Sequence, residues 1–186
     1  WLISLLGKIK KVMDKPIQRN GASNVKSDVV DLYKSETNNS STHAFHFDTE
    51  EINQFCDFTD KIETLIKNSP VKHGSVTIFT PHTTTAVLIN ESETGYINDF
   101  KRKLEDLVPS DSYYEHDDWD LRTENMQEDE NVNGRSHVRG SIIGSTAITL
   151  PIVDAEMIIG RWQRLFFVEL DCARPRRLFI QIQDIG

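Results

Sequence analysis

Residues 74–91 read GSVTIFTPHTTTAVLINE, two apolar stretches separated by a short polar break. The first stretch (76–79) and the second (86–89) have the length and the β-branched residues of buried strands. Pro81 lies between them and lacks the N–H group that a strand ladder uses, so we expect strand pairing to break there. The sequence therefore predicts two strands whose connection carries polar side chains away from the core.

The rest of the chain supplies further strands and a few short helices. Apolar residues at helical spacing predict helices that begin near Thr59 and Tyr96, and a third helix over residues 133–143. Strands are expected at about residues 43–47, 146–150, 163–170 and 177–183, without a regular alternation of strand and helix. This pattern predicts an α+β fold with mixed, mostly antiparallel sheets.

The first 42 residues differ in composition from the remainder. They hold seven Lys or Arg against four Asp or Glu, whereas the remainder holds 14 against 25 and makes the net charge −8. Residues 20–42 are rich in Ser, Asn, Thr and Lys, so we predict a mostly disordered extension over residues 1–42 and one folded domain over residues 43–186. The alternative for the apolar and basic start of the extension is a targeting or membrane-surface segment.

Composition also restricts the partners and the compartment. The acidic body lacks the clustered cations that contacts with nucleic-acid phosphates require. No apolar run approaches the roughly 20 residues of a membrane-spanning helix. Two cysteines in a chain of 186 residues make no disulfide framework, so we predict a soluble protein of a reducing compartment, the cytoplasm. A divalent cation or a metal-chelated substrate suits the acidic body better than nucleic acid does.

The polar break is the first candidate site. His82 can turn into a pocket where the ladder is broken, and Thr83 and Thr84 add hydroxyl and N–H groups that can hold an oxyanion. The alternative is that the threonines serve β structure and the histidine is structural. Asn90 and Glu91 end the second strand, where Glu91 can act as a base or a metal ligand.

Further candidates lie in three later segments. His116 lies in a stretch of eight carboxylates and one cation (115–130), which either is solvated or joins a metal site with N and O ligands. Asn133 is a good N-cap for a helix whose N-terminus attracts anions, and His137 falls one turn later on the same side. Arg174 and Asp171 follow an apolar strand, and they either form an ion pair or line a pocket.

These segments, in this order, resemble the YjbQ family over about residues 43–186. Four small residues, at positions 85, 134, 136 and 172, depart from those that are usual there, and residues 1–42 have no counterpart in the family core. The resemblance rests on a set of short pieces, which are the Gly-led strand into His-Thr-Thr (74–85), Ile89-Asn90-Glu91, Asp99, His116, Asn133 with His137, Gly144-Ser145, Gly160 with Trp162-Gln163, Glu169-Leu170-Asp171 and Arg174.

The resemblance implies an α+β fold, a homotrimer with a pocket near a subunit interface, and a thiamine-phosphate synthase activity. This activity joins a pyrimidine methyl diphosphate to a thiazole phosphate and releases pyrophosphate. It implies a small phosphorylated metabolite as partner and a divalent metal, Mg or Zn. The alternatives are a non-catalytic metal- or metabolite-binding trimer, and a scaffold whose polar cluster only holds the trimer together.

The residue roles follow from the resemblance and from the chemistry of the side chains. The expected site consists of His82, Glu91 and His137 as catalytic residues, Thr83, Thr84, Asn90, Asn133 and Arg174 as substrate or phosphate ligands, and His82, His116 and His137 as metal ligands.

Overall fold

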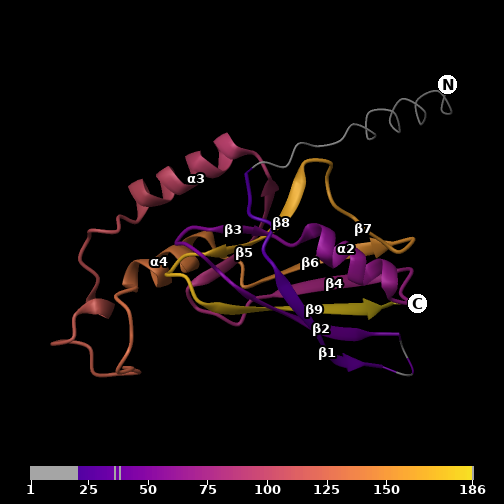
Figure 1. Cartoon of the computed structure of the whole chain (residues 1–186), viewed down its shortest axis with the longest axis horizontal. Coiled ribbons are helices and arrows are strands. Elements are labelled where there is room, and N and C mark those ends of the chain that lie inside the picture. Colours follow the sequence, from indigo (N-terminus) through magenta and orange to yellow (C-terminus); the bar gives the residue numbers. More distant parts are fainter. Residues whose placement is uncertain (1–20, 36, 38, 186) are drawn as a thin grey trace.

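The computed structural model describes residues 21–185 except residues 36 and 38. Its strands form two antiparallel sheets, a larger one with the order β1-β2-β9-β4-β6-β7 and a smaller one with the order β3-β8-β5 (Figure 1). This confirms the predicted α+β fold with mostly antiparallel sheets.

The elements have the following bounds. The larger sheet contains β1 (Ser27–Lys34), β2 (Ser41–Asp48), β4 (Gly74–Phe79), β6 (Ala147–Val153), β7 (Glu156–Met157) and β9 (Pro175–Asp184). The smaller sheet contains β3 (Phe55–Asp57), β5 (Thr85–Glu91) and β8 (Gln163–Glu169). The helices are α2 (Thr59–Asn68), α3 (Thr94–Leu107), the 3-10 turn η1 (Glu115–Asp117) and α4 (Gly134–Ile143).

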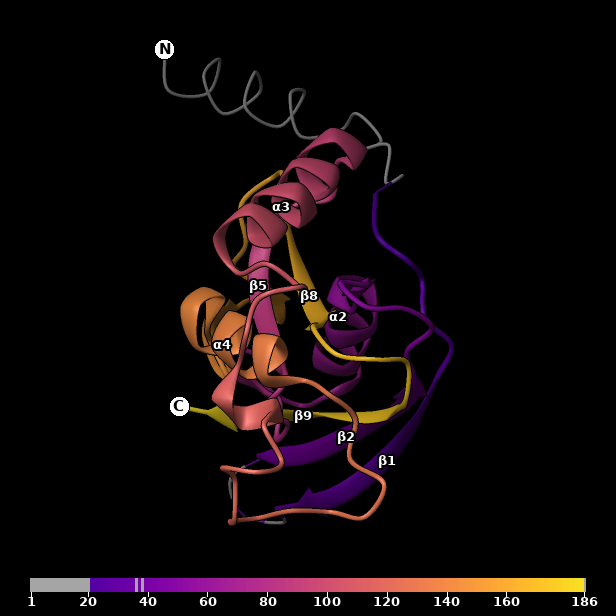
Figure 2. The same cartoon turned by 90° about the vertical axis from the view of Figure 1, so that its left-hand side faces the viewer.

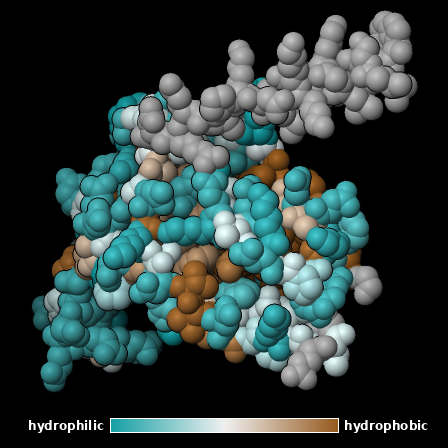
Figure 3. Space-filling view, turned by 45° about the vertical axis from the view of Figure 1, so that its right-hand side comes forward, coloured by the Kyte–Doolittle hydropathy of each residue, from teal (hydrophilic) through white to brown (hydrophobic). Residues whose placement is uncertain are grey.

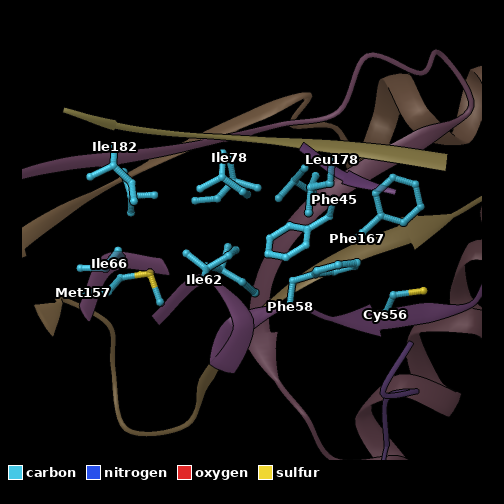
Figure 4. Packing of buried hydrophobic residues seen from close by; sticks show 14 of the residues in the cluster. Phe45, Cys56, Phe58, Ile62, Ile66, Ile78, Met157, Phe167, Leu178 and Ile182 are labelled. Atoms are coloured by element: carbon cyan, nitrogen blue, oxygen red, sulfur yellow. The ribbon is translucent and has the colours of Figure 1, made fainter. Parts of the chain in front are cut away.

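The main core lies between the larger sheet and a layer formed by α2 and the smaller sheet. In β9, Leu178, Ile180 and Ile182 are buried at alternate positions and face this core. Ile62 and Ile66 of α2 are one helical turn apart and point back toward the sheet (Figure 4). Burial of each such side chain contributes about 1.5–3 kcal/mol, so this core fixes how the two layers sit.

Strand β8 is apolar at every position from residue 165 to 168 because both of its faces are covered. Leu165 and Phe167 face the main core, whereas Phe166 and Val168 face a second core beneath α3. Strand β8 is thus buried on both faces, as is typical of continuous apolar strands. Because both cores hold β8, the position of the turn that follows it is fixed.

Gly74 is required by the close approach of β4 to β9. It pairs with Asp184 of β9, and a Cβ atom at this position would lie 1.9 Å from the carbonyl oxygen of Gln183. Any side chain here would push the two strands apart. At the other end of β4, residues 80–84 carry the chain from the larger sheet to the smaller one, so the break at Pro81 is the crossover between the sheets.

The predicted disordered extension over residues 1–42 needs a correction. Residues 1–20 lie outside the described residues. Ser27–Lys34, however, form β1, which pairs with β2 as an edge strand of the larger sheet. Most of the side chains of β1 are exposed, so backbone hydrogen bonds rather than apolar burial hold the strand. A polar composition indicates only that few side chains are buried, so it did not reveal a strand that backbone hydrogen bonds hold.

Within the described part of the chain, no helix is long and apolar enough to cross a membrane. One face of the molecule carries mostly hydrophilic side chains with small hydrophobic patches between them (Figure 3).

Candidate functional site

Four segments that are far apart in the sequence line one cavity of about 1240 Å³. They are the crossover 81–84, residues 115–131 of the loop between α3 and α4, the start of α4, and the turn 172–174 after β8 together with Arg176 of β9. In Figure 2 this loop lies below the two helices that it joins. The cavity therefore lies where chain segments leave the sheets.

The structure brings most of the predicted site residues together. Those that line the cavity are His82, Thr83, Thr84, His116, Asn133, His137 and Arg174. Asn90 and Glu91 are the exceptions. Thr85 begins β5 beside the crossover, and Glu91 ends the strand six residues later, which is about 20 Å along a strand. Within one chain, β5 thus carries Asn90 and Glu91 away from the histidines, which corrects their predicted role beside His82 and His137.

The surroundings of His82 fix which of its ring nitrogens can act. The backbone N–H of Arg177 donates to Nε2 of His82 at 3.0 Å, so the neutral ring carries its proton on Nδ1. Burial and the nearby guanidinium groups of Arg176, Arg177 and Arg174 lower the pKa of His82 to about 4. At neutral pH, His82 is therefore an uncharged hydrogen-bond donor, and its Nε2 is not available to a metal or a proton.

This lowered pKa predicts a pH dependence of stability. The unfolded chain binds a proton at His82 near pH 6.5, whereas the folded chain does so only near pH 4. The contribution of His82 is therefore fully present above pH 6.5 and is lost as the pH falls toward 4. Lowering the pH from 7 to 4.5 should therefore lower the urea midpoint of His82→Asn less than that of the wild type.

The exposed His73 provides the control for that measurement, since its side chain is 58% exposed. We expect His73→Asn to follow the wild type over the same pH range. Parallel curves for the wild type and His82→Asn would contradict the lowered pKa of His82.

A buried ion pair supports one wall of the cavity. Nε and Nη2 of Arg176 donate to the two carboxylate oxygens of Glu169 at 2.6 Å each, and Nη2 also contacts Oγ1 of Thr84 at 3.2 Å. The hydroxyl of Thr49 donates to the same carboxylate at 3.0 Å. Sequence reasoning missed Arg176, although an acid at the end of an apolar strand was a signal that a buried cation lies opposite. Glu169 balances the charge of Arg176, and the hydrogen bond from Arg176 to Thr84 fixes the position of the Thr84 hydroxyl.

Arg174 both forms an ion pair and lines the cavity, so the two predicted alternatives hold together. Its Nη2 lies 2.7 Å from Oδ2 of Asp171 and 2.9 Å from Sγ of Cys172. The side chain of Arg174 is 34% exposed, against 13% for Arg122 and 5% for Arg176, which also line the cavity. Of these three guanidinium groups, that of Arg174 is the most accessible to an anionic ligand.

His116 and His137 lie side by side, with their ring centroids 4.5 Å apart. Burial and the neighbouring His116 lower the pKa of His137, although Asp171 and Glu130 act in the opposite direction. Among residues 21–185 with their two gaps, no three His, Cys, Asp or Glu side chains converge as metal ligands. Within one chain, Nε2 of His82 faces a backbone N–H, and the three-histidine metal site stays a prediction.

The N-terminus of α4 is occupied by a carboxylate of the same chain. Oδ1 of Asp117 accepts hydrogen bonds from the backbone N–H groups of Asn133 and Gly134 at 3.0 and 2.9 Å. Partial burial acts to raise the pKa of Asp117, but these hydrogen bonds and one from His116 lower it overall. The side chain of Asn133, the predicted cap, makes no capping hydrogen bond. The first two N–H groups at this helix end are therefore already paired within the chain.

Gly134, one of the departures from the usual family residues, fits this arrangement. A Cβ atom at this position would lie 2.6 Å from Cβ of Tyr114 and 2.9 Å from Oδ2 of Asp117. Glycine lowers the helix propensity here, but a larger residue would displace the carboxylate that caps α4.

Fold and site together define a class: α+β proteins of two antiparallel sheets with a polar cavity lined by histidine and arginine. Residues 43–185 match the family described as "UPF0047 protein YjbQ-like", and the chain belongs to this family. A UPF0047 protein from Archaeoglobus fulgidus is 32% identical over 128 residues, which cover 69% of this chain and 90% of the relative. The UPF0047 protein YugU of Bacillus subtilis is 24% identical over 135 residues, which cover 72% and 92%.

Solved structures agree with this family. The crystal structure of a YbjQ-like protein of unknown function from Sulfolobus solfataricus gives a TM-score of 0.67 at 23% identity, covering 86% of this chain and 99% of that one. That of a hypothetical protein from Aeropyrum pernix gives 0.66 at 28% identity, covering 77% and 98%. The family resemblance and the fold are thus confirmed, and the activity has to be inferred from the site.

Proposed function

We propose that the cavity binds a small phosphorylated metabolite and that the protein is a thiamine-phosphate synthase. In this role it joins a pyrimidine methyl diphosphate to a thiazole phosphate and releases pyrophosphate. The observation that carries the proposal is that the accessible guanidinium of Arg174 and the neutral His82 line the same cavity. Both present N–H donors, and phosphate oxygens are strong acceptors of such hydrogen bonds.

The proposed reaction places its main demand on the leaving group. The thiazole nitrogen attacks the methylene carbon of the pyrimidine, the C–O bond to the diphosphate breaks, and pyrophosphate leaves with the electron pair. Donors aimed at the leaving oxygens stabilise the charge that grows there. Nδ1 of His82 and the free side of the Arg174 guanidinium serve as these donors, and the cavity holds both substrates in contact.

Mg²⁺ enters this proposal as part of the substrate. A diphosphate binds Mg²⁺ through its own oxygens, and Mg²⁺ keeps several waters, so the protein needs to supply few ligands. The described residues are compatible with this because they offer single carboxylates near the cavity, such as Glu130, rather than three converging ligands.

We include a homotrimer in the proposal. A row of apolar residues crosses five strands on the outer face of the larger sheet, opposite the main core. Cross-strand pairing places them in the order Val30, Ala44, Phe179, Phe79 and Ala147. Val30 is 44% exposed and Phe79 is 40% exposed. Ala44 within the row is buried, and the exposed apolar side chains on either side of it are typical of interaction sites, so the row supports contacts between copies of the chain.

An assay of the purified chain with both precursors and Mg²⁺ tests the activity. We expect thiamine phosphate and pyrophosphate in equal amounts. His82→Ala removes a donor to the leaving group and is expected to lower the rate about 100-fold. His73→Ala is the matched control, because this exposed histidine precedes β4 and does not line the cavity.

The possible outcomes separate the three functions. Equal rates for the wild type and His82→Ala would remove the catalytic assignment. If no product forms but the phosphorylated precursors bind in a manner that depends on Arg174, the protein is a non-catalytic binding protein. If neither substrate binds, the scaffold alternative is left.

A further inference from the structure

Asn133 lines the cavity, and its side chain carries an unsatisfied polar atom. The residue is only 6% exposed. Its Nδ2 donates to Oδ2 of Asp171 at 3.1 Å, whereas its Oδ1 is buried and has no hydrogen-bond partner in the described part of the chain. A buried acceptor without a partner costs about 1–3 kcal/mol. Such a group calls for an explanation.

Asp171 fixes the orientation of this carboxamide. Its side chain is 2% exposed, and its Oδ2 accepts from Nη2 of Arg174 at 2.7 Å. An oxygen that already accepts from a guanidinium group is an acceptor, so Asn133 must turn its NH₂ group toward it. The opposite orientation would place two oxygens in contact and leave the NH₂ group unpaired. Oδ1 is therefore held on the side away from Asp171.

The position of Asn133 in the helix gives Oδ1 no other task. An asparagine at the N-cap ordinarily uses this oxygen to accept a backbone N–H of the first turn. In α4 the side chain of Asn133 makes no such hydrogen bond, and Asp117 from η1 accepts the N–H groups of Asn133 and Gly134. The chain thus supplies a second residue to cap the helix and leaves the asparagine oxygen unused.

We propose that Oδ1 of Asn133 accepts a hydrogen bond from an N–H group of the ligand, so that the cavity selects phosphorylated molecules that carry an amino group. This inference rests on the proposed function, because it concerns the same cavity and names a feature of its substrate. Nδ2 of Asn133 and Nη2 of Arg174 contact the same oxygen of Asp171, which holds the two side chains in a fixed relation. Arg174 attracts the phosphate, and Asn133 recognises the amino group.

The selectivity follows from a hydrogen bond that only one of two ligands can form. A ligand with the amino group pairs with the buried oxygen, whereas an isosteric ligand without it leaves the oxygen unpaired, as it is in the free protein. Sites built to receive a hydrogen bond reject analogues that lack the donor far more strongly than apolar pockets reject a missing methylene.

Calorimetric titration of two ligands tests this inference. The first is an aminopyrimidine methyl phosphate, and the second is the analogue in which hydrogen replaces the amino group. The wild type is expected to bind the amino compound about 10- to 100-fold more tightly. Asn133→Leu should bind both compounds with the weaker affinity. Asn131→Leu is the matched control and should keep the preference, since Asn131 lines the same cavity but is exposed.

A test on the ligand side avoids any dependence on folding of the variant. The N,N-dimethylamino derivative lacks both N–H donors, and the wild type should bind it as weakly as the hydrogen analogue. Equal affinity of the wild type for the amino and hydrogen compounds would overturn the inference while leaving phosphate binding intact. If neither compound binds, the proposed function itself fails, and these two results are distinct.

Discussion

Replacement of Glu169 by alanine is expected to lower the free energy of unfolding by about 3–5 kcal/mol. Glu169 is fully buried, and its carboxylate receives two hydrogen bonds of 2.6 Å from Arg176. Alanine would leave the guanidinium of Arg176, which is 5% exposed, without its counter-charge. The main cost comes from this unpaired buried charge. Urea denaturation followed by circular dichroism measures the change.

A double substitution separates the charge from the packing. Glu169→Leu combined with Arg176→Met removes both charges and keeps a similar apolar volume. Replacing a buried ion pair in this way is often neutral, so the double variant should be at least about 2 kcal/mol more stable than Glu169→Ala. The contact of Arg176 with Thr84 is lost in the double variant, so weaker ligand binding is expected there even with folding restored. A loss below about 1 kcal/mol for Glu169→Ala would show that the pair is not effectively buried.

Local sequence patterns predicted those features that a single segment determines. The apolar run of β8 and the break at Pro81 both lie where expected, and α4 ends at Ile143 with Gly144 as its C-cap residue. Pro81 ends the strand pairing at the point where the chain crosses from one sheet to the other, and this break was sufficient to place His82 away from the core. The cavity contains His82 for this reason.

Contacts between distant segments could not be predicted from these patterns. Asn133 has the residue type of an N-cap, but Asp117, 16 residues earlier in the chain, takes that role. Glu91 follows a buried strand, as many site residues do, yet only the direction of β5 shows that it lies far from His82. Strand β1 is ordered by backbone pairing with β2, and backbone hydrogen bonds leave no signal in side-chain composition.

The second large effect is expected at Arg139, which is fully buried in α4. Its Nε and Nη2 donate to the carbonyl oxygen of Val108 at 3.1 and 2.6 Å, and Nη2 contacts Oε2 of Glu105 at 2.5 Å. Val108 is the C-cap of α3, where carbonyl groups lack partners within the helix and a positive charge is favourable. Arg139→Met keeps the length of the side chain but leaves this carbonyl unpaired. We expect a loss of about 2–4 kcal/mol, measured by urea denaturation.

Arg102→Met is the matched control for this prediction. Arg102 lies on α3 and is 62% exposed, and its ion pair with Asp99 is a surface contact, so a change within about 0.5 kcal/mol is expected. An equally small change for Arg139→Met would show that α3 and α4 do not depend on their bridge. Because α4 also carries His137 into the cavity, a loosened bridge should weaken ligand binding as well as stability. Binding that stays unchanged in a destabilised Arg139→Met would mean that the crossover and the turn after β8, rather than α4, hold the ligand.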